Sequence, residues 1–360
     1  MNAPPPDVKP IEGAKLDPRR YFERVGEQRT PIAAEDPVCL YLETTNRCNL
    51  LCTTCPRTFE ELEPPSDMSW ELFTSIVDQY PNIQRVVLHG VGEPMMVAEL
   101  PRMVKYLKDR GVYALFNTNG TLMREKKSRE LIEAGLDEMR ISLDAAEPKA
   151  FEAVRGRDLF QRILRNIKNF VALKKRMGAA KPRLSLWLTG LRETLEQLPA
   201  FIRLAHDIGV PEVHLQRLVY FENNPIGLAR PESSLFENSE AFEGKYLLEA
   251  EKIAARLGVL FDASGAGEPE ASLRRLDAGT PWSLCRRPWS LMYFTAHGRA
   301  LPCCIAPFSM HGYENFTLGD AKTTPLPGIW NGAGYRSFRE ALLSESPPQA
   351  CAGCGLRWSL

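Results

Sequence analysis

Three cysteines on one short segment are the residues best suited to chemistry in this sequence. Cys48, Cys52 and Cys55 lie in the run Cys-Asn-Leu-Leu-Cys-Thr-Thr-Cys. Three thiolates on one loop can hold three corners of an iron–sulfur cube and leave the fourth iron open. An open metal position is a place for chemistry, whereas a closed four-cysteine site carries electrons or braces the fold. The spacing therefore indicates a reactive iron–sulfur site, with a zinc site or scattered buried cysteines as the alternatives.

A second group of cysteines lies near the other end of the sequence. Its members are Cys285, Cys303, Cys304, Cys351 and Cys354. Four thiolates from three distant segments can bind an iron–sulfur cluster or a zinc ion, because tetrahedral thiolate sites do not reveal their metal in sequence. Cys303 and its neighbour Cys304 compete for one ligand position, and both choices stay open at this point.

The composition sets these cysteines in an ordinary globular chain. The 360 residues include 45 Lys and Arg and 45 Asp and Glu, so the zero net charge gives no reason to expect nucleic acid. The first ten residues lack the apolar core of a secretory signal, and no apolar run reaches membrane-spanning length. We therefore expect a cytoplasmic protein without a membrane partner. In that compartment cysteines serve as metal ligands more often than in disulfides, although Cys39, inside an expected strand, is predicted to be a core residue.

Apolar segments of strand and helix character alternate along most of the chain. Helices are expected near residues 69–80, 98–109, 124–134, 160–177 and 195–208. Strands are expected at residues 38–43, 85–89, 112–117, 138–143, 183–189 and 212–218. This order predicts an α/β fold with a parallel sheet, whose loops at the carboxyl ends of the strands carry the site. The first cysteine segment follows the first strand, in agreement with that rule.

Changes in pattern divide the chain into four expected parts. Residues 1–36 are rich in proline and form an N-terminal arm, and residues 37–220 contain the alternating elements. Residues 221–280 are a connecting helical segment. Residues 281–360 are a small α+β domain with a β-hairpin near 291–295, and this domain holds the second group of cysteines.

Four ordered motifs resemble the signature of the radical S-adenosylmethionine (SAM) enzymes. The cysteine run Cys48–Cys55 follows the first strand, and Gly90–Pro94, with Val91 inside the glycine pair, follows the second. Thr118–Gly120 follows the third strand and Ile141–Asp144 ends the fourth. The resemblance implies a partial (βα)6 TIM-type barrel over residues 37–220.

The resemblance also implies how the cofactors bind. Cys48, Cys52 and Cys55 would hold a [4Fe–4S] cluster whose open iron chelates SAM. Reductive cleavage of SAM then gives a 5′-deoxyadenosyl radical that takes hydrogen from the substrate. The family positions that contact SAM correspond to Gly92, Glu93, Pro94, Thr118, Asn119, Ser142 and Arg155. In one departure, Thr54 stands where the family often has an aromatic residue against the adenine.

The second group of cysteines resembles the twitch domain, a shortened form of the SPASM domain. The matching features are Cys285, Gly298 followed by Cys303 after four residues, and Cys351 followed by Cys354 after two. The resemblance implies that these four cysteines hold a second, auxiliary [4Fe–4S] cluster, which accepts an electron from the substrate radical. A zinc ion is the alternative occupant.

These features favour a radical SAM enzyme, most simply an oxidoreductase. The first expectation is oxidation, or another radical modification, of a small polar substrate such as a sugar, an aminocyclitol or a natural-product intermediate. A reducing partner such as flavodoxin or ferredoxin would supply the electron. The alternatives are a peptide- or protein-modifying maturase of the SPASM class and a non-catalytic iron–sulfur or zinc protein. No general base can be assigned from the sequence.

Overall fold

One sheet runs through the whole of the described molecule. The computed structural model describes residues 29–220, 225–235, 241–264, 282, 285–309, 311–313 and 316–352. In this part of the chain the strand order is β10-β9-β8-β1-β2-β3-β4-β5-β6-β7. The strands are β1 (Cys39–Leu42), β2 (Arg85–Val87), β3 (Tyr113–Thr118), β4 (Glu138–Ser142), β5 (Arg183–Gly190), β6 (Glu212–Arg217), β7 (Leu260–Ala263), β8 (Leu291–Phe294), β9 (Arg299–Leu301) and β10 (Gly319–Asp320).

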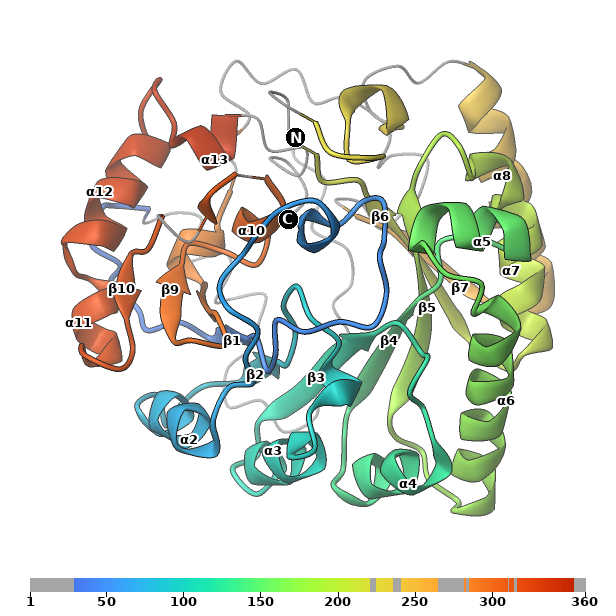
Figure 1. Cartoon of the computed structure of the whole chain (residues 1–360), viewed down its shortest axis with the longest axis horizontal. Helices are drawn as coiled ribbons and strands as arrows, with labels where there is room; N and C mark the ends of the chain where they lie inside the picture. The colour runs from blue at the N-terminus through green and yellow to red at the C-terminus, as the bar shows by residue number, and fades with distance from the viewer. Residues whose placement is uncertain are drawn as a thin grey trace.

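The strands β1 to β6 are the six expected from the sequence, and each pairs with the next in parallel. The helices that follow them are α2 (Trp70–Asp78), α3 (Leu100–Lys108), α4 (Glu125–Glu133), α5 (Pro148–Arg155), α6 (Phe160–Arg176) and α7 (Leu198–Asp207). Figure 1 shows α2, α3, α4 and α6 on the outer side of the curved sheet. The predicted α/β class with a parallel barrel-like sheet is confirmed, although α5 was not predicted.

Apolar residues on the outer side of the sheet pack against these helices and form the main core. Leu40, Val86, Phe116 and Ile141 are completely buried there, as is Ile167 of α6. Burial of such side chains is the main favourable term in folding. The core therefore fixes the strands, and the strands fix the loops at their carboxyl ends.

The segment expected to be a helical connection also contributes a strand. It contains α8 (Ala241–Leu257), as predicted, but β7 follows and pairs in parallel with β6. Only one residue of β7, Ala263, is buried. A short strand that is largely solvent-exposed lacks the apolar run by which strands are recognised in sequence.

The C-terminal elements continue the same sheet. β8 and β9 form the predicted hairpin, and β8 also pairs in parallel with β1, from Cys39 opposite Leu291 to Leu42 opposite Phe294. The remaining helices are α10 (Ala306–Ser309), α11 (Leu326–Trp330), α12 (Ala333–Leu342) and α13 (Gln349–Ala352). The hairpin thus attaches this region to the first strand. Within the described residues, no helix is both long and apolar enough to cross a membrane.

Candidate functional site

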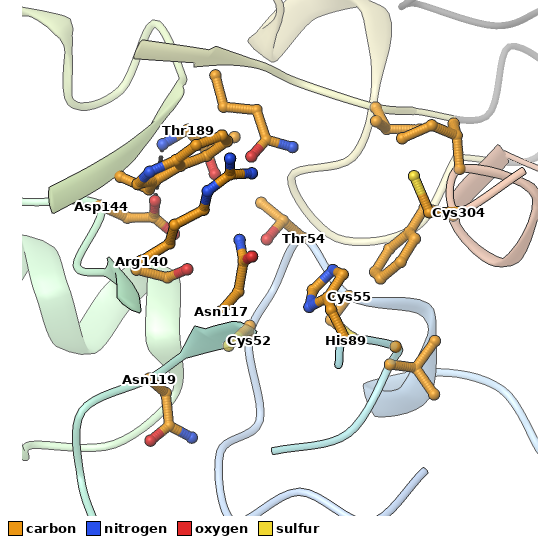
Figure 2. Close-up of a pocket in the computed structure, with 18 of the residues that line it drawn as sticks. Cys52, Thr54, Cys55, His89, Asn117, Asn119, Arg140, Asp144, Thr189 and Cys304 are labelled. Atoms are coloured by element: carbon orange, nitrogen blue, oxygen red, sulfur yellow. Dashed lines mark hydrogen bonds between the residues drawn. The ribbon is translucent and has the colours of Figure 1, made fainter. Parts of the chain in front are cut away.

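A cavity of about 610 Å³ lies at the carboxyl ends of the parallel strands. All three cysteines of the first group line it, and so does Cys304 of the second group. Figure 2 shows Cys52 and Cys55 near its centre, Asp144 and Thr189 on one side, and Cys304 on the other. One cavity therefore borders both cysteine regions.

The loop that follows β1 presents the three cysteines at the cavity wall, and each is partly buried. The loop is tied to itself by a hydrogen bond from Cys55 N to Cys52 O (3.2 Å), and to the end of α5 by one from Thr53 N to Val154 O (2.8 Å). Burial raises the pKa of the Cys48 thiol and raises that of Cys55 to about 12. Metal binding must therefore displace protons from these thiols.

The donor set of this loop fits an iron–sulfur cube. Among the described residues, no three His, Cys, Asp or Glu side chains converge as they would around a single metal ion. A mononuclear zinc site needs such convergence, whereas a cube bonds each thiolate to a different iron and keeps the sulfurs apart. Three cysteines that line one cavity without converging on a single point fit the spacing that a cube requires.

The segment from Gly90 to Glu93 lies against the cysteine loop so closely that it requires glycine. A Cβ atom at Gly92 would lie 2.1 Å from the carbonyl oxygen of Thr45, and one at Gly90 would lie 2.2 Å from Cγ of Glu43. No other residue fits such an approach without moving the backbone. Val91, between the two glycines, does not disturb this packing and is itself buried.

Glu93 fixes the shape of this segment from inside. Its buried carboxylate accepts hydrogen bonds from Thr118 Oγ1 (2.7 Å), Asn119 N (2.6 Å) and Met95 N (2.9 Å). Burial raises the pKa of Glu93, although these three hydrogen bonds act against that rise. The carboxylate thus holds the second and third strand ends together. The backbone carbonyls of Glu93 and Pro94 accept hydrogen bonds from Met96 N and Val97 N (both 3.0 Å), and each keeps a second lone pair for a ligand.

Asn119 connects the third strand end to the cysteine loop. Its Nδ2 group donates to Asn49 Oδ1 (2.9 Å) and lies 3.8 Å from Cys48 Sγ. Its Oδ1 atom accepts a hydrogen bond from Thr121 Oγ1 (2.7 Å). The side chain therefore orients Cys48, besides lining the cavity.

Arg155 reaches the cavity from the last turn of α5. Its guanidinium forms an ion pair with Asp144 (2.7 Å) and lies 3.7 Å from Cys52 Sγ. Burial acts to lower the pKa of Arg155, but the charges of Asp144 and Cys52 hold it above its ordinary value. Asp144 itself adopts a left-handed conformation (φ 55°) and accepts a hydrogen bond from Thr189 N (2.7 Å). Ser142 lines the cavity beside this pair.

Glu43 connects the two halves of the molecule beneath the cavity. Its completely buried carboxylate accepts hydrogen bonds from Val91 N (2.9 Å), Tyr293 Oη (2.8 Å) and Ala296 N (3.1 Å). Val91 belongs to the glycine segment, whereas Tyr293 and Ala296 belong to β8 and the turn after it. Burial raises the pKa of Glu43 to about 7. No motif in the sequence points to this residue.

The second cysteine region is described only in part. Cys285, Cys303, Cys304 and Cys351 are partly buried, while Cys354 lies outside the described residues. The short helix α10 follows Cys304, and the short helix α13 contains Cys351. These two helices lie against each other. The fold therefore brings distant cysteine segments together, but the choice between Cys303 and Cys304 as ligand stays a prediction.

Arg287 supplies positive charge beside this second region. It lines the cavity together with Cys304. Burial acts to lower its pKa, but the nearby thiols of Cys304, Cys303 and Cys285 raise it above the ordinary value. Burial also raises the pKa of Cys304 to about 11. A cation next to several thiolates suits a negatively charged cluster.

Several polar residues inside the barrel line the cavity and were not predicted. The Trp187 and His214 rings stack with centroids 4.1 Å apart, and the Arg140 guanidinium lies 4.5 Å from the Trp187 ring. Arg85, in β2, lines the same cavity. A signal in the sequence could have identified Arg85 and Arg140. Each is a charged residue within a strand of a parallel sheet, and such strands are usually apolar on both sides.

Comparisons with known proteins agree with the site. Residues 42–205 match the family model of the Radical SAM superfamily, and residues 285–355 match SPASM, an iron–sulfur cluster-binding domain. The fold is similar to that of SuiB from Streptococcus suis bound to the precursor peptide SuiA (TM-score 0.64, 14% identity, 95% of this chain and 73% of that chain).

Curated relatives match either about half of the chain or most of it. A tungsten-containing aldehyde ferredoxin oxidoreductase cofactor-modifying protein of Pyrococcus furiosus is 31% identical over 183 residues, which cover 50% of this chain and 51% of that protein. The match thus spans about half the length of this relative.

Two further relatives match over most of their length. The AdoMet-dependent heme synthase of Nitratidesulfovibrio vulgaris is 24% identical, covering 91% of this chain and 90% of that protein. The mycofactocin maturase MftC of Mycolicibacterium smegmatis is 28% identical, covering 89% and 76%. The two matched domains carry the predicted cofactors, namely a [4Fe–4S] cluster, SAM and auxiliary iron–sulfur clusters. The chain therefore belongs to the radical SAM superfamily, as an enzyme with a C-terminal SPASM-type domain.

Proposed function

We propose that this enzyme modifies a peptide, as a maturase of the SPASM class. The observation that carries the proposal is the single cavity bordered by the first cysteine loop and by Cys304. A peptide segment in this cavity lies between the site where a radical forms and a site that can take up an electron. The relative named as mycofactocin maturase supports the proposal, because it matches over most of this chain.

The chain's own residues would prepare the first step by binding SAM in one orientation. When bound, the first cluster supplies the electron that splits SAM into methionine and a 5′-deoxyadenosyl radical. The backbone carbonyls of residues 92–94 accept hydrogen bonds from the SAM ammonium group, and Arg155, with Ser142, binds the SAM carboxylate. Thr118 and Asn119, which line the same cavity, would hold the ribose or the methionine part.

The second cysteine region would complete the reaction. We propose that Cys285, Cys303, Cys351 and Cys354 hold one auxiliary [4Fe–4S] cluster, the number that the twitch form implies. Removal of a hydrogen atom leaves a substrate radical, and the loss of one electron and one proton from that radical gives an oxidised product. A cluster held by these cysteines would accept that electron, whereas a reducing partner such as flavodoxin or ferredoxin would supply the electron that cleaves SAM. In this form the enzyme is an oxidoreductase.

A second candidate is modification of a tetrapyrrole. The specific observation in its favour is the match with AdoMet-dependent heme synthase over 91% of this chain. The small polar substrate expected first from the sequence has less support than the maturase, because the relative named mycofactocin maturase matches over 89% of this chain.

The test is anaerobic turnover of the protein with both clusters reconstituted, SAM and dithionite. Peptides encoded beside the gene and coproporphyrin III are offered separately, and 5′-deoxyadenosine and product mass are measured. A mass change in a peptide supports the maturase, whereas conversion of the porphyrin alone supports the second candidate. Failure to form 5′-deoxyadenosine under any of these conditions contradicts both. The Cys52→Ala variant provides the blank.

A further inference from the structure

The cavity carries more positive charge than its cofactors need. Five arginines line it, namely Arg85, Arg140, Arg155, Arg217 and Arg287. Two of them already have a task, because Arg155 faces Asp144 and the first cysteine loop, and Arg287 faces the second group of thiols. The others belong to β2, β4 and β6. Since SAM carries a sulfonium and an ammonium group against one carboxylate, it does not neutralise them.

The carboxylates that line the cavity are also occupied. Among the described residues these are Glu93 and Asp144. Glu93 accepts three hydrogen bonds from the strand ends around it. Asp144 pairs with Arg155 and accepts a hydrogen bond from Thr189 N. Neither carboxylate is within ion-pair distance of Arg85 or Arg140.

Arg85 lies at the end of the cavity far from the SAM segment. It is the first residue of β2, and His89 and Gly90 follow at the other end of that strand. Four residues of strand span about 13 Å, so Arg85 forms part of the cavity floor. Among the described residues, its buried Nε atom has no hydrogen-bond partner, and no carboxylate forms an ion pair with it. Arg85 as a whole is half-buried, and Glu138 lies near enough for its charge to raise the pKa of Arg85. A buried guanidinium nitrogen without a hydrogen bond is costly, so a ligand that supplies an acceptor here would be favoured.

Arg140 forms the neighbouring part of the floor and is held rigidly. Its Nε group donates to Glu138 Oε1 (2.6 Å), and its guanidinium plane packs on Trp187. Arg183 uses the other oxygen of Glu138 (3.2 Å) from outside the cavity. Burial acts to raise the pKa of Glu138, but Arg140 and Arg85 hold it at about 2. Arg183 also pairs with Glu212 (3.4 Å), so on the cavity side Glu138 alone faces both Arg85 and Arg140.

We propose that the floor formed by Arg85 and Arg140 binds a carboxylate of the substrate. A carboxylate matches the planar fork of a guanidinium and replaces the hydrogen bonds that the floor lacks. His89 also lines the cavity, and its buried Nδ1 atom has no partner among the described residues. This inference rests on the proposed function in one respect: the carboxylate belongs to a peptide, as an acidic side chain. A tetrapyrrole propionate has the same chemistry and is distinguished by the test.

The test measures binding to cluster-loaded, SAM-bound protein under anaerobic conditions. One probe is the peptide Gly-Glu-Tyr-Glu-Gly-Gly with an acetylated N-terminus and an amidated C-terminus, compared by calorimetry with a twin in which Gln replaces both Glu. The other is coproporphyrin III, compared with its tetramethyl ester. We expect at least one acidic probe to bind about tenfold or more tightly than its neutral twin, the range of a charge-assisted hydrogen bond.

Three variants test whether Arg85 causes the preference for the acidic probe. Arg85→Met should remove the preference for the acidic probe, and Arg85→Lys, which keeps the charge, should restore part of it. Arg183→Gln is the matched control, because it removes another guanidinium from Glu138 outside the cavity, and it should leave the preference within about twofold. Circular dichroism checks that each variant is folded.

The outcomes separate this inference from the proposed function. Equal binding of each acidic probe and its twin, binding of neither acidic probe, or a preference that survives in Arg85→Met contradicts the anion site. If mass spectrometry shows that a peptide is modified, but its acidic and neutral forms bind equally well, the proposed maturase function is supported and the proposed carboxylate site at Arg85 and Arg140 is contradicted. If only coproporphyrin III binds more tightly than its neutral twin, if Arg85→Met removes this preference, and if no peptide is modified, the carboxylate site is supported and the maturase function is contradicted.

Discussion

The two cysteine regions are built in opposite ways. The first takes its three cysteines from eight consecutive residues, on a loop between β1 and α2. Asn119, which follows β3, and Arg155, at the end of α5, orient them. The second draws its cysteines from segments that are far apart in sequence, which meet only because β8 and β9 form a hairpin and α10 and α13 pack together. The first is a local loop that the fold positions, whereas the second exists only in the folded chain.

This difference predicts different consequences of losing one cysteine. In the first region each thiolate holds one corner of a cluster whose open iron does the chemistry. In the second region the thiolates close a site that, in our proposal, only receives an electron. Loss of a cysteine in the first should therefore stop the radical from forming, and loss in the second should stop the reaction later.

The largest effect is expected for Cys52→Ala. This variant removes a ligand beside Arg155, so 5′-deoxyadenosine formation should fall to the background of dithionite and SAM alone. Iron should fall from roughly eight to roughly four atoms per chain, the difference of one cube. Chromatography of the nucleoside and iron analysis measure the two quantities. Cys39→Ala is the matched control, since Cys39 lies in β1 and should not affect either; SAM cleavage by Cys52→Ala at the wild-type rate would refute the ligand assignment.

The next effect should separate the two regions. Cys351→Ala should also lower iron to roughly four atoms per chain but keep SAM cleavage within about twofold, while product formation is lost. Product is followed by mass spectrometry once a substrate is known, and iron content and cleavage are measured without one. Cys303→Ala and Cys304→Ala, compared side by side, identify the ligand, because only the ligand variant should lose iron. Normal turnover by Cys351→Ala would contradict the electron-acceptor role.

A smaller effect is expected at the ion pair behind the first region. Asp144→Asn keeps the hydrogen bond from Thr189 N and tolerates the left-handed backbone, but it removes the charge that holds Arg155. The dissociation constant of SAM should rise about tenfold, because Arg155 no longer presents its guanidinium to the SAM carboxylate in a fixed position. Equilibrium binding measures this. Asp78→Asn, at an exposed pair with Arg110, is the control and should change nothing.

The smallest effect concerns the link between the regions. The folded-state pKa of Glu43 is about 7, above its ordinary value of 4.5, so the folded chain binds more protons than the unfolded chain between these values. The free energy of unfolding should fall by on the order of 2 kcal/mol as pH rises from 5 to 8. Burial is the main cause, and the charge of Glu63 adds to it, while Tyr293, Val91 N and Ala296 N donate to the carboxylate.

Glu43→Gln should remove this part of the pH dependence, because an amide does not titrate. Denaturant unfolding of the variant and the wild type at several pH values measures the difference. The exposed Glu71→Gln serves as the control and should follow the wild type. A variant that loses stability with pH as steeply as the wild type would show that Glu43 does not titrate in this range.

The sequence predicted the parts that depend on local pattern. The six parallel strands were recognised because each is an apolar run between amphipathic helices. Glu93 and Asn119, from the motifs after the second and third strands, line one cavity. The helix α5 was missed, although Arg155 is its last residue. It is short and begins with Pro148, so it resembles a loop in sequence.

The parts that depend on register could not be predicted. Trp187 and His214 stack because β5 and β6 pair with these residues opposite each other. Arg85 and Arg140 meet at the cavity floor from strands that are not neighbours. No spacing along the chain records such a meeting, since strand register is set by the packing of the whole sheet.

The pairing of β1 with β8 has a consequence for how the protein is made. During synthesis β1 emerges first, but its partner β8 follows only after the whole parallel barrel has left the ribosome. Until then β1 is an exposed edge strand, which invites wrong pairing with other chains. The buried Glu43 also lacks two of its three donors, Tyr293 and Ala296, until β8 arrives. The support beneath the first cysteine loop is therefore complete only after β8 has been synthesised. A chain that leaves the ribosome before β8 is made keeps β1 as an unpaired edge strand, which favours aggregation.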